Sequence, residues 1–219
     1  MDNIKHWLVE RKIIYFIFSL LYDGKIDQAL DIIKKNELLQ NFSDYIDNKQ
    51  LSDGSAQVIK ELHENQNNNH YKDLILEEYQ RLFIGPDEIL APLWESVYKT
   101  KDKLLFGEIE LEIRRYYNSI GLDVKENEPA DYLPLQLSFM SRLCDIDDNN
   151  NLVNINENLI KQWKFLKEHL LAWISSWEAD VNQNTEIQIW TGFAQMTKGW
   201  LENDFDEIEK VIEIMVKLE

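Results

Sequence analysis

Residues 78–86 read Glu78-Tyr79-Gln80-Arg81-Leu82-Phe83-Ile84-Gly85-Pro86. Tyr79, Leu82 and Phe83 recur at spacings of three and four, which places their side chains on one face of a helix. Gly85 and Pro86 end that helix, because glycine accepts the left-handed conformation common after a helix and proline cannot continue one. The stretch therefore predicts a helix with an apolar face and a sharp end.

The same helical period runs through nearly the whole chain. Only 7 glycines and 4 prolines interrupt it, and no alternating run of residues predicts a sheet. The predicted fold is all-α, a single-domain helical bundle with room for a C-terminal helical subdomain. The expected helices cover residues 3–22, 26–39, a segment ending near 63, 70–83, 105–120, 131–144, 156–181, 185–202 and 204–218.

A chain of 219 residues is long enough for one sizeable domain and too short to require two. We therefore expect one domain over residues 1–219. The polar run at residues 147–151 is the expected place for a hinge. Exchange of the C-terminal helices between subunits would use that hinge, and the sequence leaves monomer and dimer open.

The chain carries 40 acidic and 23 basic residues, a formal net charge of −17. Such a surface repels phosphate backbones, which argues against a nucleic-acid partner. It attracts a basic peptide and speeds encounter with it. Charge that serves only solubility is the alternative interpretation.

Two features predict a cytoplasmic protein. Cys144 is the only cysteine, so no disulfide can form within the chain, and we expect it to be a small buried hydrophobe. The apolar run at residues 13–22 is too short to span a membrane and no small-residue cleavage site follows it. A buried amphipathic helix explains this run better than a signal peptide.

The sequence lacks the usual motifs of an enzyme. It has no GxxxxGK[ST] phosphate loop and no GxGxxG after a strand. The histidines, His6, His63, His70 and His169, form neither HExxH nor a Glu-x-x-His pair. We therefore predict no catalytic residue, no metal and no cofactor. An enzyme would need a nucleotide or a metal, which mass spectrometry of the purified protein would detect.

Two segments combine aromatic and acidic residues in a way that suits binding of a cationic, partly apolar peptide. Trp94 lies between Pro92 and Glu95 on an irregular stretch, where an aromatic side chain either contacts a ligand or anchors the loop in the core. Glu128 and Asp131 lie at an expected helix start. There a carboxylate either caps the helix or pairs with an arginine by two parallel hydrogen bonds.

Four motifs in this order resemble the TorD/DmsD family, and the DmsD branch in particular. They are Leu82-Phe83-Ile84-Gly85-Pro86 with Ala91-Pro92-Leu93-Trp94, then Leu105-Phe106-Gly107, Glu128-Pro129-Ala130-Asp131-Tyr132 and His169-Leu170-Leu171-Ala172-Trp173. The second-last is similar to the family's EPxDH signature and the last to its HLLPW segment. Tyr132 replaces the usual histidine, Leu93 a second proline and Ala172 a common proline.

The resemblance implies a cytoplasmic chaperone for a molybdopterin-containing reductase exported by the twin-arginine (Tat) pathway. Its partners would be the twin-arginine leader, the apo form of the catalytic subunit and Tat translocase components. Gly85, Pro86 and Pro129 would shape the loops. The expected leader-binding residues are Tyr79, Leu82, Phe83, Pro92, Trp94, Glu95, Glu128, Asp131 and Tyr132.

A helical scaffold is the alternative function. Such a protein would bind the mature enzyme subunit through its general surface, without a leader-specific groove, and would bind that subunit equally well when the leader is absent.

Overall fold

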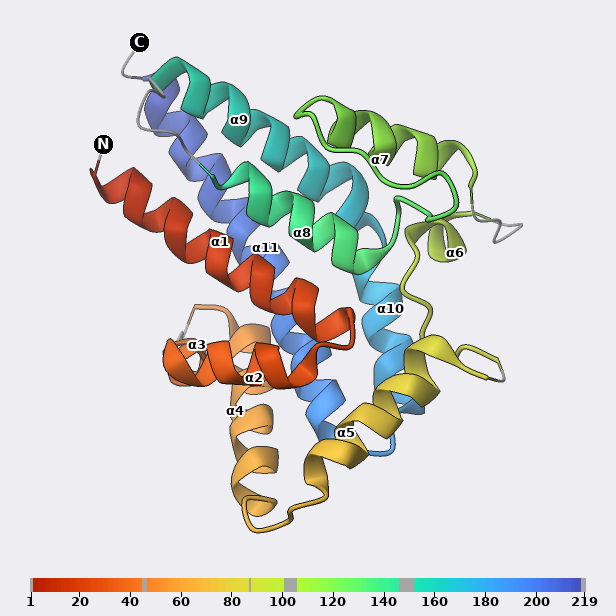
Figure 1. The fold of residues 1–219 in the computed structure, drawn as a ribbon. Coiled ribbons are helices and arrows are strands. Elements are labelled where there is room, and N and C mark those ends of the chain that lie inside the picture. The colour runs from red at the N-terminus through yellow and green to blue at the C-terminus, as the bar shows by residue number, and fades with distance from the viewer. Residues whose placement is uncertain (1, 45–46, 87, 101–105, 146–151, 218–219) are drawn as a thin grey trace. The chain divides into compact units, whose positions relative to one another are not determined.

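The structure is a computed structural model that describes residues 2–44, 47–86, 88–100, 106–145 and 152–217. Within these ranges the chain is helical (Figure 1), and it forms no strand beyond one isolated bridge between Trp94 and Tyr132. The all-α prediction is confirmed. The elements are α1 (Asp2–Tyr22), α2 (Ile26–Lys35), α3 (Leu38–Ser43), α4 (Lys49–Glu64), α5 (Tyr71–Tyr79), the π-helical turn η1 (Gln80–Ile84), α6 (Glu95–Lys99), α7 (Glu108–Asn118), α8 (Leu133–Leu143), α9 (Leu152–Phe165), the π-helical turn η2 (Leu166–Leu170), α10 (Leu171–Asn184) and α11 (Gln188–Val216).

Two expected helix boundaries were wrong. The helix predicted over residues 26–39 is divided into α2 and α3 by Glu37, which has a φ of 52°. The two helices predicted over 185–202 and 204–218 are a single helix, α11. Asp204 lies within α11, and its buried side chain accepts a hydrogen bond from Arg11.

The chain divides into two compact units. Unit 1 comprises Met1–Ser19, Trp94–Ala172 and Asp204–Glu219, and unit 2 comprises Leu20–Leu93 and Trp173–Asn203. Whether residues 1–219 act as the predicted single domain stays a prediction. The predicted hinge at 147–151 lies outside the described residues.

Unit 1 encloses a buried ionic cluster centred on Asp204. Arg11 of α1 donates to both oxygens of this carboxylate, from Nε at 2.5 Å and from Nη2 at 2.9 Å. The Tyr15 hydroxyl donates to Oδ2 at 2.5 Å, and Gln162 of α9 accepts from Arg11. Removal from water disfavours both charges, so the bidentate geometry is what makes their burial tolerable.

The apolar side chains of α1 and Cys144 also lie in the interior. Ile17 and Phe18 are fully buried, which confirms the prediction that residues 13–22 form a buried helix face. Burial raises the pKa of the Cys144 thiol to about 12, as expected of an inert buried cysteine. Among the described helices, none has the length and apolarity needed to cross a membrane.

Unit 2 is built around aromatic rings and a close helix contact. Tyr22 and Trp177 meet edge to face with centroids 5.1 Å apart, and Phe83 meets Trp190 in the same way at 5.2 Å. Helices α4 and α11 approach so closely that a Cβ on Gly192 would lie 2.8 Å from the main-chain oxygen of Gly54. Only glycine fits at this contact.

We expect Gly192→Ala to lower the free energy of unfolding by about 1–3 kcal/mol, because α4 and α11 must separate to admit the methyl group. Urea denaturation monitored by circular dichroism measures the change. The control is Gln188→Ala, which alters an exposed residue at the start of the same helix. Equal stability of the two variants would contradict the close contact.

Candidate functional site

The polar residues of the stretch Glu78–Pro86 stabilise the structure of unit 2. Glu78 accepts hydrogen bonds from Arg81 Nε at 2.7 Å and from the Glu186 amide at 2.6 Å. Arg81 also donates to the main-chain oxygen of Asn184 at 2.5 Å. Burial of Glu78 opposes its ionisation, but the bonds from Arg81 and Glu186 outweigh this and lower its pKa. These contacts fix η1 to the turn between α10 and α11.

The apolar residues of the same stretch face the core of unit 2. Leu82 and Phe83 have no exposed area and Tyr79 is 4% exposed. The Tyr79 hydroxyl donates to the main-chain oxygen of Tyr22 at 2.9 Å. The three side chains therefore present no apolar wall at the surface in this conformation, and their contact with a leader stays a prediction.

The loop after η1 begins with a glycine in a conformation that other residues rarely adopt. Gly85 has a φ of 93°. The Ala91 amide then donates to the main-chain oxygen of Leu82 at 2.9 Å, which closes the loop. Pro86 is exposed, whereas Pro92 is half-buried. A loop-shaping role for Gly85 agrees with this geometry.

In unit 1 the motif Glu128–Tyr132 contacts Trp94 and Glu95, which follow this loop. Trp94 and Tyr132 form the isolated antiparallel bridge, and their rings stack with centroids 5.4 Å apart and an interplanar angle of 28°. Both rings are half-buried. The sequence did not predict that these two residues are neighbours, although it named both as candidate contacts. We call them the Trp94–Tyr132 pair.

Asp131 caps a helix, but a different one from the helix that the sequence predicted. Its Oδ2 accepts a hydrogen bond from the Ser96 amide at 2.9 Å, in the first turn of α6. Its main-chain oxygen accepts from the Glu95 amide at 3.2 Å. Helix α8 begins after Tyr132 without a side-chain cap and with Pro134 in its first turn. The Asp131 carboxylate thus holds α6 beside the start of α8.

Glu95 is fully buried and joins three elements of unit 1. Its Oε1 accepts from Lys99 Nζ at 2.8 Å and lies 3.0 Å from Nδ1 of His169 in η2. Its Oε2 accepts from Gln136 Nε2 of α8 at 3.0 Å. Charge-assisted hydrogen bonds of this kind stabilise a buried carboxylate. Glu95 is therefore a structural centre beside the Trp94–Tyr132 pair.

The remaining candidates from the motif Glu128–Tyr132 lie nearer to solvent. Glu128 is exposed, and its Oε1 accepts from Lys125 Nζ at 3.1 Å. Pro129 is half-buried one residue later. The main-chain oxygen of Glu128 accepts from Arg114 at 3.1 Å, which ties this segment to α7. Glu128 is thus exposed to solvent, in contrast to Asp131 and Glu95.

Sequence reasoning missed the partners of Glu95. Gln136 is a polar residue within the otherwise apolar first half of α8, and such a residue in a buried helix usually has a buried hydrogen-bond partner. His169 stood in a motif that resembled the family, but its spacing from Glu95 gave no sign of contact. Only the fold brings the two together.

Comparison with known proteins identifies the family of the chain. The family model described as the nitrate reductase delta subunit matches residues 48–179, which include the stretches 78–86 and 128–132. Similar proteins include TorD and DmsD chaperones. The chain belongs to the TorD/DmsD family.

Three relatives show the extent of the similarity. A probable Tat proofreading chaperone DmsD of Haemophilus influenzae is 28% identical over 69% of this chain and 66% of its own length, just under two thirds. The chaperone protein TorD of Vibrio cholerae serotype O1 is 22% identical over 88% of this chain and 89% of its own. The chaperone protein TorD of Vibrio vulnificus strain YJ016 is 26% identical over 92% and 99%. These relatives are named as chaperones, which supports the prediction of a redox-enzyme maturation chaperone and not an enzyme.

The titration of Asp131 gives a test of its buried position. Burial raises the pKa of this carboxyl group, and the hydrogen bonds from Ser96 offset the rise only in part. A group whose pKa is raised on folding loses its contribution to stability as the pH rises from its unfolded pKa, about 3.9, through its folded pKa. The non-titrating variant Asp131→Asn should therefore gain stability relative to the wild type as the pH rises above about 4.

The matched control is Asp145→Asn. Burial opposes ionisation of Asp145 as well, but hydrogen bonds from Lys12 and Arg142 lower its pKa overall. Its variant should show the opposite trend and lose stability relative to the wild type as the pH rises. Urea denaturation at several pH values measures both trends. A pH-independent difference between Asp131→Asn and the wild type would contradict the raised pKa.

Proposed function

We propose that this protein is a cytoplasmic chaperone that binds the twin-arginine leader of an exported molybdopterin oxidoreductase subunit. It would protect the apoprotein while the cofactor is inserted and before export. Family membership supports this proposal, as does the description of the Haemophilus relative as a Tat proofreading chaperone. The observation that carries it in the structure is the Trp94–Tyr132 pair.

The pair suits the apolar part of a leader. Two stacked, half-exposed rings offer a rigid apolar surface, and tyrosine adds a polar tip. Bonds from the Ser96 and Glu95 amides to Asp131 fix the backbone on which the rings stand. A binding surface that is already ordered loses little entropy when a peptide binds. In this proposal Asp131 and Glu95 position the rings.

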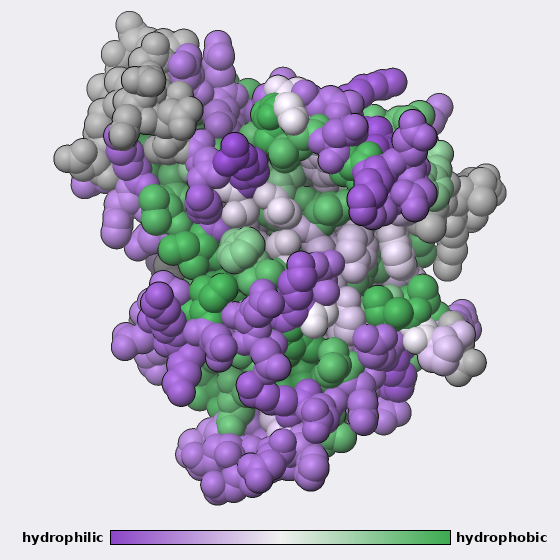
Figure 2. Space-filling view, viewed as in Figure 1, coloured by the Kyte–Doolittle hydropathy of each residue, from purple (hydrophilic) through white to green (hydrophobic). Residues whose placement is uncertain are grey.

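The arginines of a leader would be attracted by the acidic surface. The formal net charge is −17, and hydrophilic residues cover much of the face seen in Figure 2. Glu128 is the exposed carboxylate of the motif Glu128–Tyr132. We propose it as an arginine contact. Direct pairing of an arginine with Asp131 or Glu95 stays a prediction, and it requires the site to open, because both carboxylates are fully buried.

Titration calorimetry with a synthetic twin-arginine leader tests the proposal. Trp94→Ala and Tyr132→Ala should each weaken binding by about tenfold or more, since a central aromatic contact contributes about 2 kcal/mol. The control is Phe16→Ala, which removes an aromatic side chain that is 46% exposed on α1. Equal losses in all three variants would argue against a specific role for the pair.

A second peptide, with both arginines changed to lysine, tests the charged part of recognition. We expect it to bind more weakly, because lysine cannot make the planar two-point contact. Equal binding would assign recognition to the apolar stretch alone. Binding of neither peptide, together with binding of the mature subunit without its leader, would favour the scaffold function.

A further inference from the structure

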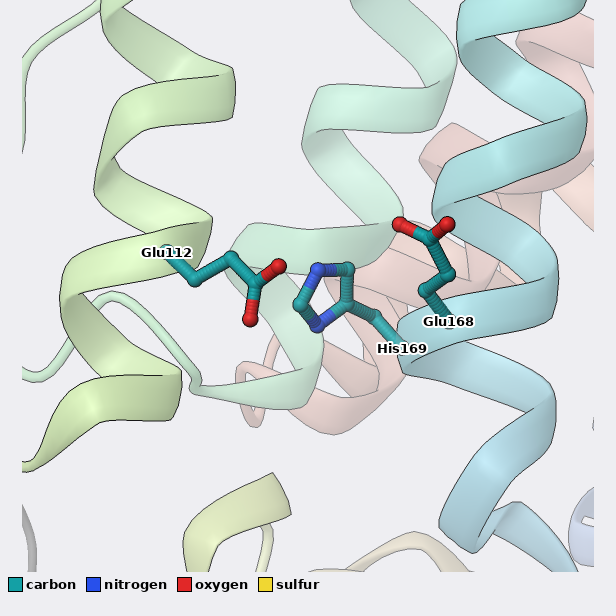
Figure 3. A group of neighbouring side chains, drawn as sticks. All are labelled: Glu112, Glu168 and His169. Atoms are coloured by element: carbon teal, nitrogen blue, oxygen red, sulfur yellow. The ribbon is translucent and has the colours of Figure 1, made fainter.

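Three side chains on two elements of unit 1 converge at a place that the proposed leader contacts do not use. Glu112 comes from α7, whereas Glu168 and His169 are neighbours in the π-helical turn η2. One oxygen or nitrogen atom from each lies within 4.8 Å of the others. Figure 3 shows the imidazole of His169 lying between the two carboxylates. Turns of this π-helical kind often occur at functional sites.

His169 is held in the orientation of a metal ligand. Its side chain is 1% exposed, and Nδ1 lies 3.0 Å from Glu95 Oε1. A carboxylate can only accept a hydrogen bond, so Nδ1 carries the hydrogen, and in the neutral ring Nε2 offers a lone pair. Nε2 is buried and has no hydrogen-bond partner among the residues that the structure describes. A carboxylate behind a histidine is the usual outer support of a metal-bound imidazole.

The two glutamates can complete the site. Both are exposed, so their carboxylates can adjust. The Tyr116 hydroxyl donates to Glu168 Oε2 at 3.0 Å, which orients this carboxylate and leaves Oε1 available. Zinc bonds to nitrogen and oxygen are about 2.0–2.2 Å long. Movements of about 1 Å in the exposed side chains bring the three atoms to such distances.

Lys99 lies close to this cluster. Lys99 Nζ donates to the main-chain oxygen of Glu168 and to Glu95 Oε1, each at 2.8 Å. Its charge is therefore balanced by the buried Glu95 carboxylate, so Lys99 does not neutralise Glu112 or Glu168.

We infer that Glu112, Glu168 and His169 bind one Zn²⁺ ion at the surface of unit 1. One imidazole nitrogen and two carboxylate oxygens are ligands that zinc accepts, and three protein ligands leave a fourth position open to water or to a partner's side chain. The inference is independent of leader binding.

Calorimetric titration of the chelator-treated protein with Zn²⁺ alone tests the inference. We expect one ion per chain, and a loss of affinity of at least tenfold in both Glu112→Gln and Glu168→Gln. Each variant replaces an exposed carboxylate by an amide of the same shape, so folding should be preserved. The matched control is Glu108→Gln, an exposed carboxylate on the same helix, α7, that lies outside the cluster. It should bind as the wild type does.

The imidazole provides a second readout. Nitrogen NMR of the histidine rings should show a shift of His169 Nε2 on addition of one equivalent of Zn²⁺. Selective shifts at His6, which lies 3.3 Å from Glu10 on the surface, would instead assign binding to α1 and overturn the inference. An absence of Zn²⁺ binding, or an unchanged affinity in both cluster variants, would also overturn it. None of these outcomes changes the leader titrations.

Discussion

The buried carboxylate of Glu95 is the interaction on which the candidate site depends. Burial of a carboxylate without partners would lower the free energy of unfolding by several kcal/mol. Glu95 instead accepts hydrogen bonds from Lys99 and Gln136 and lies beside His169. These partners lie on α6, α8 and η2. The three elements are coupled through one side chain, because movement of any of them would expose or unpair a buried charge. The rings of Trp94 and Tyr132 belong to residues directly before α6 and α8, two of these elements.

Helical periodicity predicted much of the fold and little of the site. The apolar spacing of Leu82 and Phe83 correctly indicated a helix, but the same spacing serves a core face and a binding face equally well. Burial decides between these uses, and burial depends on segments far away in the sequence. The π-helical turns were also missed, because one extra residue in a turn leaves no clear mark on a helical pattern.

Asp131 shows the same limit for a polar residue. Its place before an apolar run correctly suggested a helix cap, yet the amide that it accepts from belongs to Ser96, 35 residues earlier. Local sequence identifies a residue that can cap a helix, whereas the tertiary fold determines which helix it caps. The stacking of Trp94 on Tyr132 likewise depends on how the fold brings distant segments together. A tyrosine at this position retains the aromatic surface that stacks on Trp94, although the family usually has a histidine there.

The pairing of Arg11 with Asp204 has a consequence for synthesis of the chain. The two residues are separated by 193 positions. A ribosome must therefore synthesise all the residues between them before Arg11 can meet the carboxylate that balances its charge. The interior of unit 1 is completed only after its segment Asp204–Glu219 has been synthesised, so Arg11 lacks its buried partner while the residues between them are made.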